Sequence, residues 1–201
     1  MYNNGIKETG VNDETEKYVR EFQLGNRERF DEIVRRHKDR VFNLCYRFLG
    51  DYHEAEDVAQ DVFMKVYGGL GDFRFQSSFS TWLYRVTVNT CNNKIKSGEF
   101  LFFRKLLSFH KPDAGENPLL YEIPDVKMAP DKAIENKELE SIIHKAIMSL
   151  PSEQRTVVVL RDVEGLSYEE ISAITGFNLG TVKSKLSRAR LHLRDKLKGK
   201  I

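Results

Sequence analysis

The most informative segment of the sequence lies in the last quarter of the chain and reads SYEEISAITGFNLGTVKSKLSRAR, residues 167–190. Its first four residues form a capping box, in which the serine hydroxyl and the second glutamate satisfy backbone N–H groups at a helix start. Gly176 follows the expected end of this helix, where a left-handed conformation is easiest for glycine. Asn178 is a good N-cap, so we expect a second helix from Leu179 to about Lys196.

The second helix has an apolar side and a basic side. A helix, a short glycine turn and a basic helix form a helix-turn-helix, whose second helix enters the major groove of DNA. The alternative is a solvated basic helix at the chain end. The basic residues begin directly after the turn, and Thr181 and Ser184 can donate to phosphates beside them, which favours DNA binding. The apolar positions are Val182, Leu186, Ala189 and Leu193.

The rest of the C-terminal half also reads as helical. Residues 135–150 place apolar side chains on one face at helical spacing. Pro151 stands where the next helix would begin, a position that tolerates proline. The β-branched run Val157–Leu160 could pass for a strand, but its flanks favour a buried helix.

The N-terminal half shows the same periodicity. Apolar residues recur at helical spacing over residues 30–48, 55–66 and 79–86. We expect Gly68, Gly69 and Gly71 to end the second of these helices. A short helix over 91–96 follows a predicted turn at Val88-Asn89-Thr90.

The prolines indicate how the halves are joined. Four of the five, at positions 112, 118, 124 and 130, fall within nineteen residues. Proline lacks a backbone donor and biases the preceding residue away from helix. The predicted fold is therefore all-α, with two small helical domains joined by a Pro-rich linker. The predicted parts are an N-terminal segment 1–21, a domain 22–97, a linker 98–130 and a helix-turn-helix domain 131–201.

Composition excludes several classes of protein. The 201 residues contain two cysteines, Cys45 and Cys91, too few for a disulfide framework or a four-cysteine zinc site. No apolar run approaches the ~18 residues of a membrane span, and residues 1–10 lack the apolar core of a signal peptide, so we expect a cytoplasmic protein. The histidines show no metal spacing, and no catalytic constellation or phosphate loop is visible. We expect no enzyme activity, cofactor or metal.

Charge is segregated along the chain. Residues 51–61 hold five acids and no Lys or Arg, whereas residues 74–97 hold four basic residues and no acid. Residues 179–201 hold eight basic residues against Asp195 alone, a local balance of +7. Segregated charge of this kind indicates different partners for different faces.

Two ordered sets of motifs resemble one family. The C-terminal segments LPSEQR (150–155), LRDVEGLSYEEI (160–171) and GTVKSKLSRAR (180–190) are similar to the promoter-reading domain of bacterial sigma factors. The N-terminal segments AEDVAQDVF (55–63) and FSTWLYRVTVN (79–89) resemble the core of the same family. The length and two-domain plan resemble the extracytoplasmic-function (ECF) group of the sigma-70 family. One departure is Ser172, where the family usually has alanine.

The resemblance implies that the first domain binds the unpaired minus-ten element of a promoter. Aromatic stacking and a positive groove hold single strands, and the acid-free stretch 74–97 supplies both. In this family the pocket for a flipped base lies in the turn between the last two helices of the domain, which we expect at Val88-Asn89-Thr90. Phe79 and Trp82 fit a core role better than a stacking role. The predicted single-strand contacts are Asn89, Lys94, Lys96, Arg74 and Arg85.

The resemblance also implies a docking helix and a duplex reader. The acidic helix would bind a basic coiled coil of core RNA polymerase, through Asp57, Gln60 and Asp61; its other interpretation is a solvated face. The second domain would bind the duplex minus-thirty-five element. The predicted base contacts are Lys183, Ser184 and Arg188, and the predicted phosphate contacts are Arg161, Thr181 and Lys185.

The function expected from this resemblance is that of a sigma initiation factor, which directs core RNA polymerase to promoters and helps open them. The expected partners are core polymerase, duplex and single-stranded promoter DNA, and an anti-sigma factor. The alternatives are a helix-turn-helix regulator that is not a polymerase subunit, and an enzyme acting on nucleic acid. The regulator hypothesis leaves the aromatic and basic stretch 74–97 unexplained. The enzyme hypothesis is disfavoured because the sequence shows no acid-base or metal cluster.

Overall fold

The structure is a computed structural model that describes residues 5–98, 100–101 and 130–199, and these residues form helices and turns without strands. The prediction of an all-α fold is therefore confirmed for this part of the chain. Most of the predicted linker, residues 98–130, lies outside the described residues. The domain boundaries stay a prediction.

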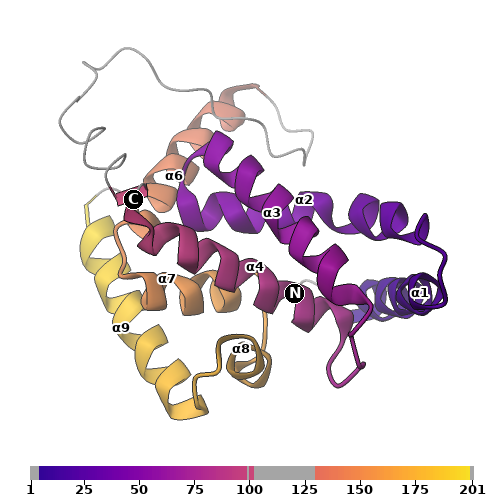
Figure 1. Cartoon of the computed structure of the whole chain (residues 1–201). Coiled ribbons are helices and arrows are strands. Elements are labelled where there is room, and N and C mark those ends of the chain that lie inside the picture. The colour runs from indigo at the N-terminus through magenta and orange to yellow at the C-terminus, as the bar shows by residue number, and fades with distance from the viewer. Residues whose placement is uncertain (1–4, 99, 102–129, 200–201) are drawn as a thin grey trace.

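The N-terminal half contains four helices, coloured indigo to magenta in Figure 1: α1 (Gly5–Gln23), α2 (Arg29–Leu49), α3 (Tyr52–Leu70) and α4 (Phe79–Lys96). Helix α2 packs on α1, α3 and α4, which makes it the centre of this half. The apolar positions that the sequence places on one face of each helix meet in the core. Fully buried members include Ile33, Phe48, Val62 and Phe79.

Side chains fix where these helices begin. The Asp51 carboxylate accepts the backbone N–H of Glu54 at 3.0 Å and starts α3. The Ser78 hydroxyl accepts the N–H of Thr81 at 3.1 Å and starts α4. Each cap satisfies a donor that the first turn of a helix leaves without an intrahelical partner.

Helix α4 corrects one prediction. The expected turn at Val88-Asn89-Thr90 does not exist, and the helix runs unbroken from Phe79 to Lys96. The Thr87 and Thr90 hydroxyls donate to carbonyls four residues back, at 2.9 and 2.8 Å, so these side chains are satisfied inside a helix. Burial of the neighbouring apolar side chains holds the segment against α2 and α3. Tertiary packing thus overrides a weak local turn signal.

The end of α3 differs slightly from expectation. The helix continues through Gly68 and Gly69 to Leu70, which is fully buried, and Gly71 follows it. A side chain at Gly69 would stand 3.2 Å from the Trp82 ring, so the glycine allows α4 to approach α3 closely.

The C-terminal half, orange to yellow in Figure 1, contains α6 (Pro130–Met148), α7 (Ser152–Val158), the π-helical segment η1 (Val159–Val163), α8 (Tyr168–Thr175) and α9 (Leu179–Leu197). The β-branched run is helical and buried, as predicted, and it passes from α7 into η1. Pro151 precedes α7, as its position in the sequence predicts.

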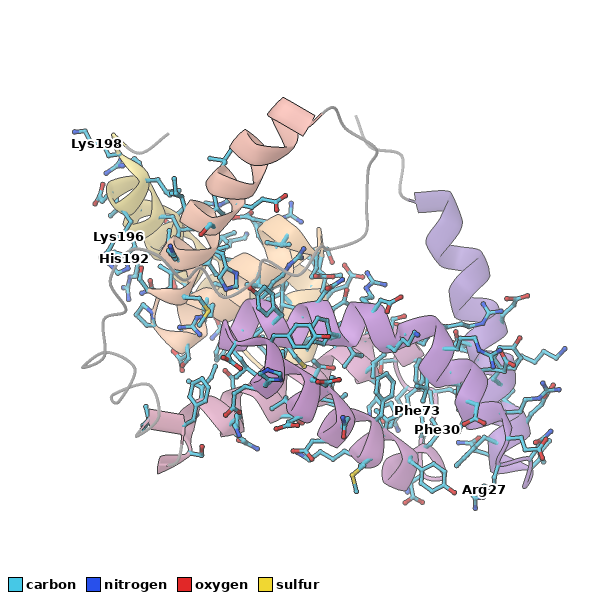
Figure 2. All side chains as sticks on the ribbon, turned by 90° about the horizontal axis from the view of Figure 1, so that it is seen from above. Arg27, Phe30, Phe73, His192, Lys196 and Lys198 are labelled. Carbon is cyan, nitrogen blue, oxygen red and sulfur yellow. The ribbon has the colours of Figure 1, made fainter. Side chains whose placement is uncertain are left out.

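The two halves share one apolar core. Helix α4 packs against α8 and α7, and α2 packs against α6. The buried Arg155 guanidinium joins the halves, because it donates to the Phe48 carbonyl of α2 and to the Met148 and Leu150 carbonyls at the end of α6. In Figure 2, His192, Lys196 and Lys198 of the α9 end lie on the opposite side of the molecule from Arg27 and Phe30.

Candidate nucleic-acid interfaces

The helix-turn-helix forms as the sequence predicts. The Ser167 hydroxyl accepts the N–H of Glu170 at 3.2 Å, and the Glu170 carboxylate accepts the N–H of Ser167 at 2.7 Å. Gly176 ends α8 with φ 75° and ψ 3°, a left-handed conformation. The Asn178 side chain accepts the N–H of Thr181 at 2.7 Å and starts α9.

The turn between α8 and α9 is fixed from both sides. On the apolar face of α9, the side chains of Val182, Leu186 and Ala189 are buried, as expected. The Ser172 hydroxyl donates to the Phe177 carbonyl at 2.6 Å across the turn. The serine that departs from the family pattern therefore supplies a hydrogen bond that alanine could not make.

The outer face of α9 presents the three predicted base-contact residues to solvent. Lys183, Ser184 and Arg188 are exposed. The Ser184 hydroxyl donates to the Thr181 carbonyl at 3.0 Å, which orients it along the helix. Helix α9 lies at one edge of the molecule in Figure 1, with α7 and α8 on its inner side.

The residues predicted to bind phosphate are partly engaged within the fold. The Arg161 guanidinium donates to the Leu166 carbonyl at 2.7 Å and lies 4.9 Å from the centre of the Tyr168 ring. The Lys185 ammonium pairs with Glu153 of α7 and lies 5.1 Å from the Phe177 ring centre. Both cations therefore stabilise the arrangement of the helix-turn-helix in this structure.

Helix α4 brings three of the predicted single-strand contacts together and separates a fourth. Arg85, Asn89 and Lys96 are spaced by four and seven residues, so they share one face, and all are exposed. Lys94 lies on the other side, where its ammonium pairs with the Glu54 carboxylate of α3 at 2.6 Å. Arg74 is exposed in the loop before α4.

The aromatic residues of stretch 74–97 lie in the core or pack against it. Phe79 and Tyr84 are buried, and Trp82 packs between Phe73 and Phe79, with ring centres 5.1 and 5.8 Å away. The core role expected for Phe79 and Trp82 fits this packing. Phe75, in the loop before α4, is also partly buried, and its ring centre lies 4.8 Å from that of Phe73.

The loop over residues 71–78 is a feature that sequence reasoning missed. Phe75 has φ 55°, a conformation that a bulky residue rarely adopts. The Arg20 guanidinium of α1 lies 4.0 Å above its ring centre. Strain of this kind persists only where the surroundings enforce it, and it is concentrated at functional sites. The acid-free run that begins at Arg74 is the sequence signal by which this loop could have been found.

The acidic residues of α3 lie on its outer face. Asp57, Gln60 and Asp61 are exposed, one and two turns from Met64, whose relative exposure is 73%. An exposed methionine beside carboxylates is a surface suited to a partner with apolar and basic groups. The sequence pattern predicted the acidic face of this helix, whereas the exposure of Met64 is evident only from the structure.

His37 is a core residue, as expected from its position on an apolar helix face. It is buried at the junction of α1 and α2, with its Nε2 3.2 Å from the Thr15 hydroxyl. Burial, with help from Arg40 and Arg36, lowers the pKa of His37 to about 4. The imidazole is therefore neutral at physiological pH.

The described part of the chain offers neither a metal centre nor a membrane-spanning helix. No group of three or more His, Cys, Asp or Glu side chains there could hold a metal ion. Among the same residues, none of the helices has the length and apolar character needed to cross a membrane.

Comparison with known proteins identifies both halves. Residues 33–99 match the family described as Sigma-70 region 2, and residues 140–193 match Sigma-70, region 4. The chain is 35% identical over 185 residues to the RNA polymerase sigma-H factor of Pseudomonas aeruginosa, covering 89% of this chain and 91% of that protein. It is 35% identical over 191 residues to the ECF RNA polymerase sigma factor SigW of Bacillus subtilis, covering 90% and 96%.

Solved structures share the fold. The sigma factor RpoE of Bartonella quintana, solved with the anti-sigma factor NepR, has a TM-score of 0.60 at 24% identity, covering 85% of this chain and 97% of that one. CnrH, solved with the cytosolic domain of CnrY, has a TM-score of 0.60 at 21% identity, covering 90% and 95%. The family matches and the curated relatives together show that this chain belongs to the sigma-70 family of RNA polymerase sigma factors, as a transcription initiation factor of the ECF group.

Proposed function

We propose that this sigma factor divides its work among three surfaces. The outer face of α9 reads the duplex minus-thirty-five element, α4 with the loop 71–78 captures the unpaired minus-ten strand, and the outer face of α3 docks on core polymerase. The observation that carries the proposal is the exposure of three residues on one face of each helix, while the apolar side of the same helix is buried. These residues are Lys183, Ser184 and Arg188 on α9, Arg85, Asn89 and Lys96 on α4, and Asp57, Gln60 and Asp61 on α3.

Duplex reading rests on the helix-turn-helix. Lys183, Ser184 and Arg188 are exposed on a helix whose N-terminus is held by Asn178. Arginine donates two hydrogen bonds to guanine in the major groove, which makes Arg188 the strongest base-contact candidate. The proposed phosphate contacts are Thr181, Lys185 and Arg161. Lys185 must first break its ion pair with Glu153 before it can bind a DNA phosphate.

Strand capture uses a stacking surface and nearby donors. Because α4 is unbroken, the turn between the last two helices of this domain is the loop 71–78, between α3 and α4. We therefore propose that the pocket for a flipped base lies in this loop and not at Val88-Asn89-Thr90. Phe75 offers a ring, and Arg74 and the exposed Gln76 offer hydrogen-bond donors. The single strand then continues along α4, where it contacts Arg85, Asn89 and Lys96. Lys94 contacts the strand only if its ion pair with Glu54 breaks.

Polymerase docking uses α3. Asp57, Gln60 and Asp61 form a negative, exposed face that complements a basic partner surface, and Met64 adds an apolar contact. Relatives of this chain are named RNA polymerase sigma factors, and a solved neighbour is bound to an anti-sigma factor. We propose core polymerase and an anti-sigma factor as partners here, in the cytoplasm, with all bond-making chemistry left to the polymerase.

A reconstituted transcription assay tests the proposal. The chain is mixed with core bacterial polymerase and a library of promoter fragments, and run-off transcripts are sequenced. Specific transcripts are expected, and an Asp57→Lys, Asp61→Lys variant should lose them while keeping its fold. Specific duplex binding without transcripts would instead support a helix-turn-helix regulator that is not a polymerase subunit.

The matched control is a charge reversal elsewhere on α3, and it is compared with Asp57→Lys alone, because each single substitution changes the charge by the same amount. Glu56 is also exposed but lies outside the proposed docking set. Glu56→Lys should therefore keep most of the transcription, because it leaves Asp57, Gln60 and Asp61 in place. Equal loss in both variants would mean that net charge, rather than a defined docking face, controls polymerase binding.

A further inference from the structure

Helix α1 packs beside the loop 71–78 but lies outside the matched family region. Its residues Val19 and Phe22 are fully buried, and the helix contacts α2, α3 and α4. The match to Sigma-70 region 2 begins at residue 33, after α1 has ended at Gln23. The family match therefore says nothing about what α1 contributes to this half of the protein.

The last residue of α1 binds the backbone where the chain leaves α3. The Gln23 side-chain amide donates from Nε2 to the Leu70 carbonyl at 3.0 Å and to the Phe73 carbonyl at 2.8 Å. The backbone closes the same turn with weaker bonds, from the Asp72 N–H to the Gly69 carbonyl at 3.2 Å and from the Phe73 N–H to the Leu70 carbonyl at 3.3 Å. Both are longer than the usual length of about 2.9–3.0 Å. The Gln23 amide therefore defines much of the path of this turn.

A second residue of α1, one turn earlier, covers the strained residue of the loop. The Arg20 guanidinium lies 4.0 Å from the Phe75 ring centre, which is well within the reach of a cation–π contact. The Phe75 ring centre also lies 4.8 Å from that of Phe73, whose carbonyl Gln23 binds. The positive φ of Phe75 costs free energy that its surroundings must offset. Arg20 and Phe73 are the neighbours that hold Phe75 in this conformation.

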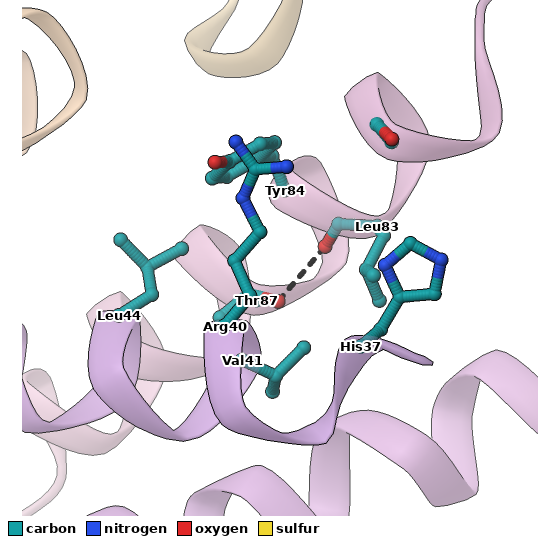
Figure 3. A pocket seen from close by; sticks show the side chains of 8 residues that line it. His37, Arg40, Val41, Leu44, Leu83, Tyr84 and Thr87 are labelled. Atoms are coloured by element: carbon teal, nitrogen blue, oxygen red, sulfur yellow. Dashed lines mark hydrogen bonds between the residues drawn. The ribbon is translucent and has the colours of Figure 1, made fainter. Parts of the chain in front are cut away.

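The other end of the loop is fixed by α2. The Phe79 ring, at the start of α4, lies 5.3 Å from the His37 ring of α2, centre to centre. Figure 3 shows the same contact further along, where Val41 of α2 lines one small cavity with Leu83 and Thr87 of α4. In this view the Thr87 hydroxyl donates to the Leu83 carbonyl within α4. Losing Gln23 or Arg20 would therefore loosen the loop while α4 stays in place.

We propose that Gln23 and Arg20 are positioning residues for the capture of the unpaired minus-ten strand. Gln23 sets the path of the loop as it leaves α3, and Arg20 sets the orientation of the Phe75 ring. This inference rests on the proposed function of the loop 71–78. Neither residue needs to touch the captured base, because each acts through the loop. A loop that is ordered beforehand loses less conformational freedom when the strand binds, which raises the affinity.

The first measurement contains no DNA. Trp82 is the only tryptophan of the chain, and its ring centre lies 5.1 Å from that of Phe73, so its fluorescence reports how the loop packs. Gln23→Met removes both hydrogen bonds at similar side-chain volume. Acrylamide should then quench Trp82 more strongly, and the amides of Asp72 and Phe73 should exchange with solvent about tenfold faster. Helical content, measured by circular dichroism, should stay that of the wild type.

The second measurement uses the holoenzyme reconstituted with core bacterial polymerase. The probe is a fluorescent single-stranded oligonucleotide that carries the minus-ten sequence selected in the transcription assay. Gln23→Met and Arg20→Gln should each weaken its binding about threefold to tenfold. Arg20→Lys should restore most of the affinity, because an ammonium group also makes a cation–π contact. Binding of a minus-thirty-five duplex should be the same in all variants.

Arg27→Gln is the matched control for Arg20→Gln. Arg27 is exposed, and Figure 2 shows it at the same end of the molecule as Phe73. Its guanidinium lies 4.4 Å from the centre of the Phe22 ring, so the control removes the same charge and the same kind of contact without touching the loop. It should keep wild-type Trp82 quenching and oligonucleotide binding. Equal losses in both arginine variants would overturn the role of Arg20, because charge alone would explain them.

Phe75→Ala separates this inference from the proposed function of the loop. Weaker oligonucleotide binding in Phe75→Ala, with wild-type binding in Gln23→Met and Arg20→Gln, would overturn the positioning role and leave strand capture standing. Unchanged Trp82 quenching and amide exchange in Gln23→Met would overturn it as well. Wild-type binding in Phe75→Ala would instead overturn strand capture by this loop, and the positioning role with it.

Discussion

Replacing Gly176 by alanine isolates the energetic contribution of the turn in the helix-turn-helix. Gly176 has φ 75°, and an added Cβ would meet nothing within 4 Å. The substitution therefore creates no clash, and its cost comes from backbone conformation alone. For a residue with a side chain, the left-handed conformation costs about 1–2 kcal/mol. We expect the free energy of unfolding to fall by about that amount.

Gly68 provides a control with the opposite sign. It lies in helix α3, where an added Cβ also meets nothing within 4 Å and φ is not positive. Alanine in a helix interior is better than glycine by about 0.5–1 kcal/mol, so Gly68→Ala should stabilise the protein.

Urea denaturation followed by circular dichroism measures both variants. The midpoints should move in opposite directions, with slopes unchanged because the surface exposed on unfolding stays the same. The folded Gly176→Ala protein should bind a minus-thirty-five duplex as the wild type does, because the packing of α8 on α9 has room for the methyl group. A midpoint for Gly176→Ala equal to or above that of the wild type would refute the conformational argument.

Three further predictions concern single side chains. Arg188→Ala should weaken promoter binding by ~1–3 kcal/mol and relax preference at one upstream position, as read by selection of bound sequences, whereas unchanged selectivity would remove it from the base contacts. Asn89→Ala should spare duplex binding but slow promoter opening, followed with a fluorescent base in the minus-ten element; equal loss of both steps would contradict its role. In the unfolded chain, His37 takes up a proton near its ordinary pKa of 6.5, whereas in the folded protein its pKa is about 4. The free energy of unfolding that depends on neutral His37 is therefore lost as the pH falls from 6.5 to 4. His37→Gln should remove roughly 3 kcal/mol of that pH dependence in urea titrations, and a variant with the wild-type pH profile would contradict the buried, neutral assignment.

The helix-turn-helix could be predicted from the sequence because its signals are local. The capping box at Ser167, the left-handed Gly176 and the Asn178 cap each act within one or two turns, and all three form as expected. The apolar faces of α2 and α9 were equally predictable from spacing alone.

The unbroken helix α4 could not be predicted from local signals. The segment Val88-Asn89-Thr90 has weak helix formers, and its helical state depends on burial between α2 and α3 and on hydroxyl bonds to preceding carbonyls. Contacts between distant segments were equally hidden. The Glu164 carboxylate accepts hydrogen bonds from Tyr84 and Arg47, which lie 80 and 117 positions away in the sequence, and no periodic pattern carries that information.

Charge patterns placed the candidate surfaces better than they placed individual contacts. Asp57 and Asp61 of α3 and Lys183 and Arg188 of α9 are exposed where predicted. Lys94, Lys185 and Arg161 are instead engaged with neighbours inside the protein. Whether a cation faces solvent or a carboxylate depends on which helix lies beside it. That neighbour is set by tertiary structure.

The continuity of α4 also limits how this protein can vary in evolution. Arg85 and Lys96 are eleven residues apart on one unbroken helix, which fixes their axial separation at about 16 Å. Inserting a single residue between them would rotate Lys96 by about 100° around the axis, away from Arg85 and Asn89. Insertions and deletions in homologous genes should therefore be absent from this helix and accumulate between positions 98 and 130.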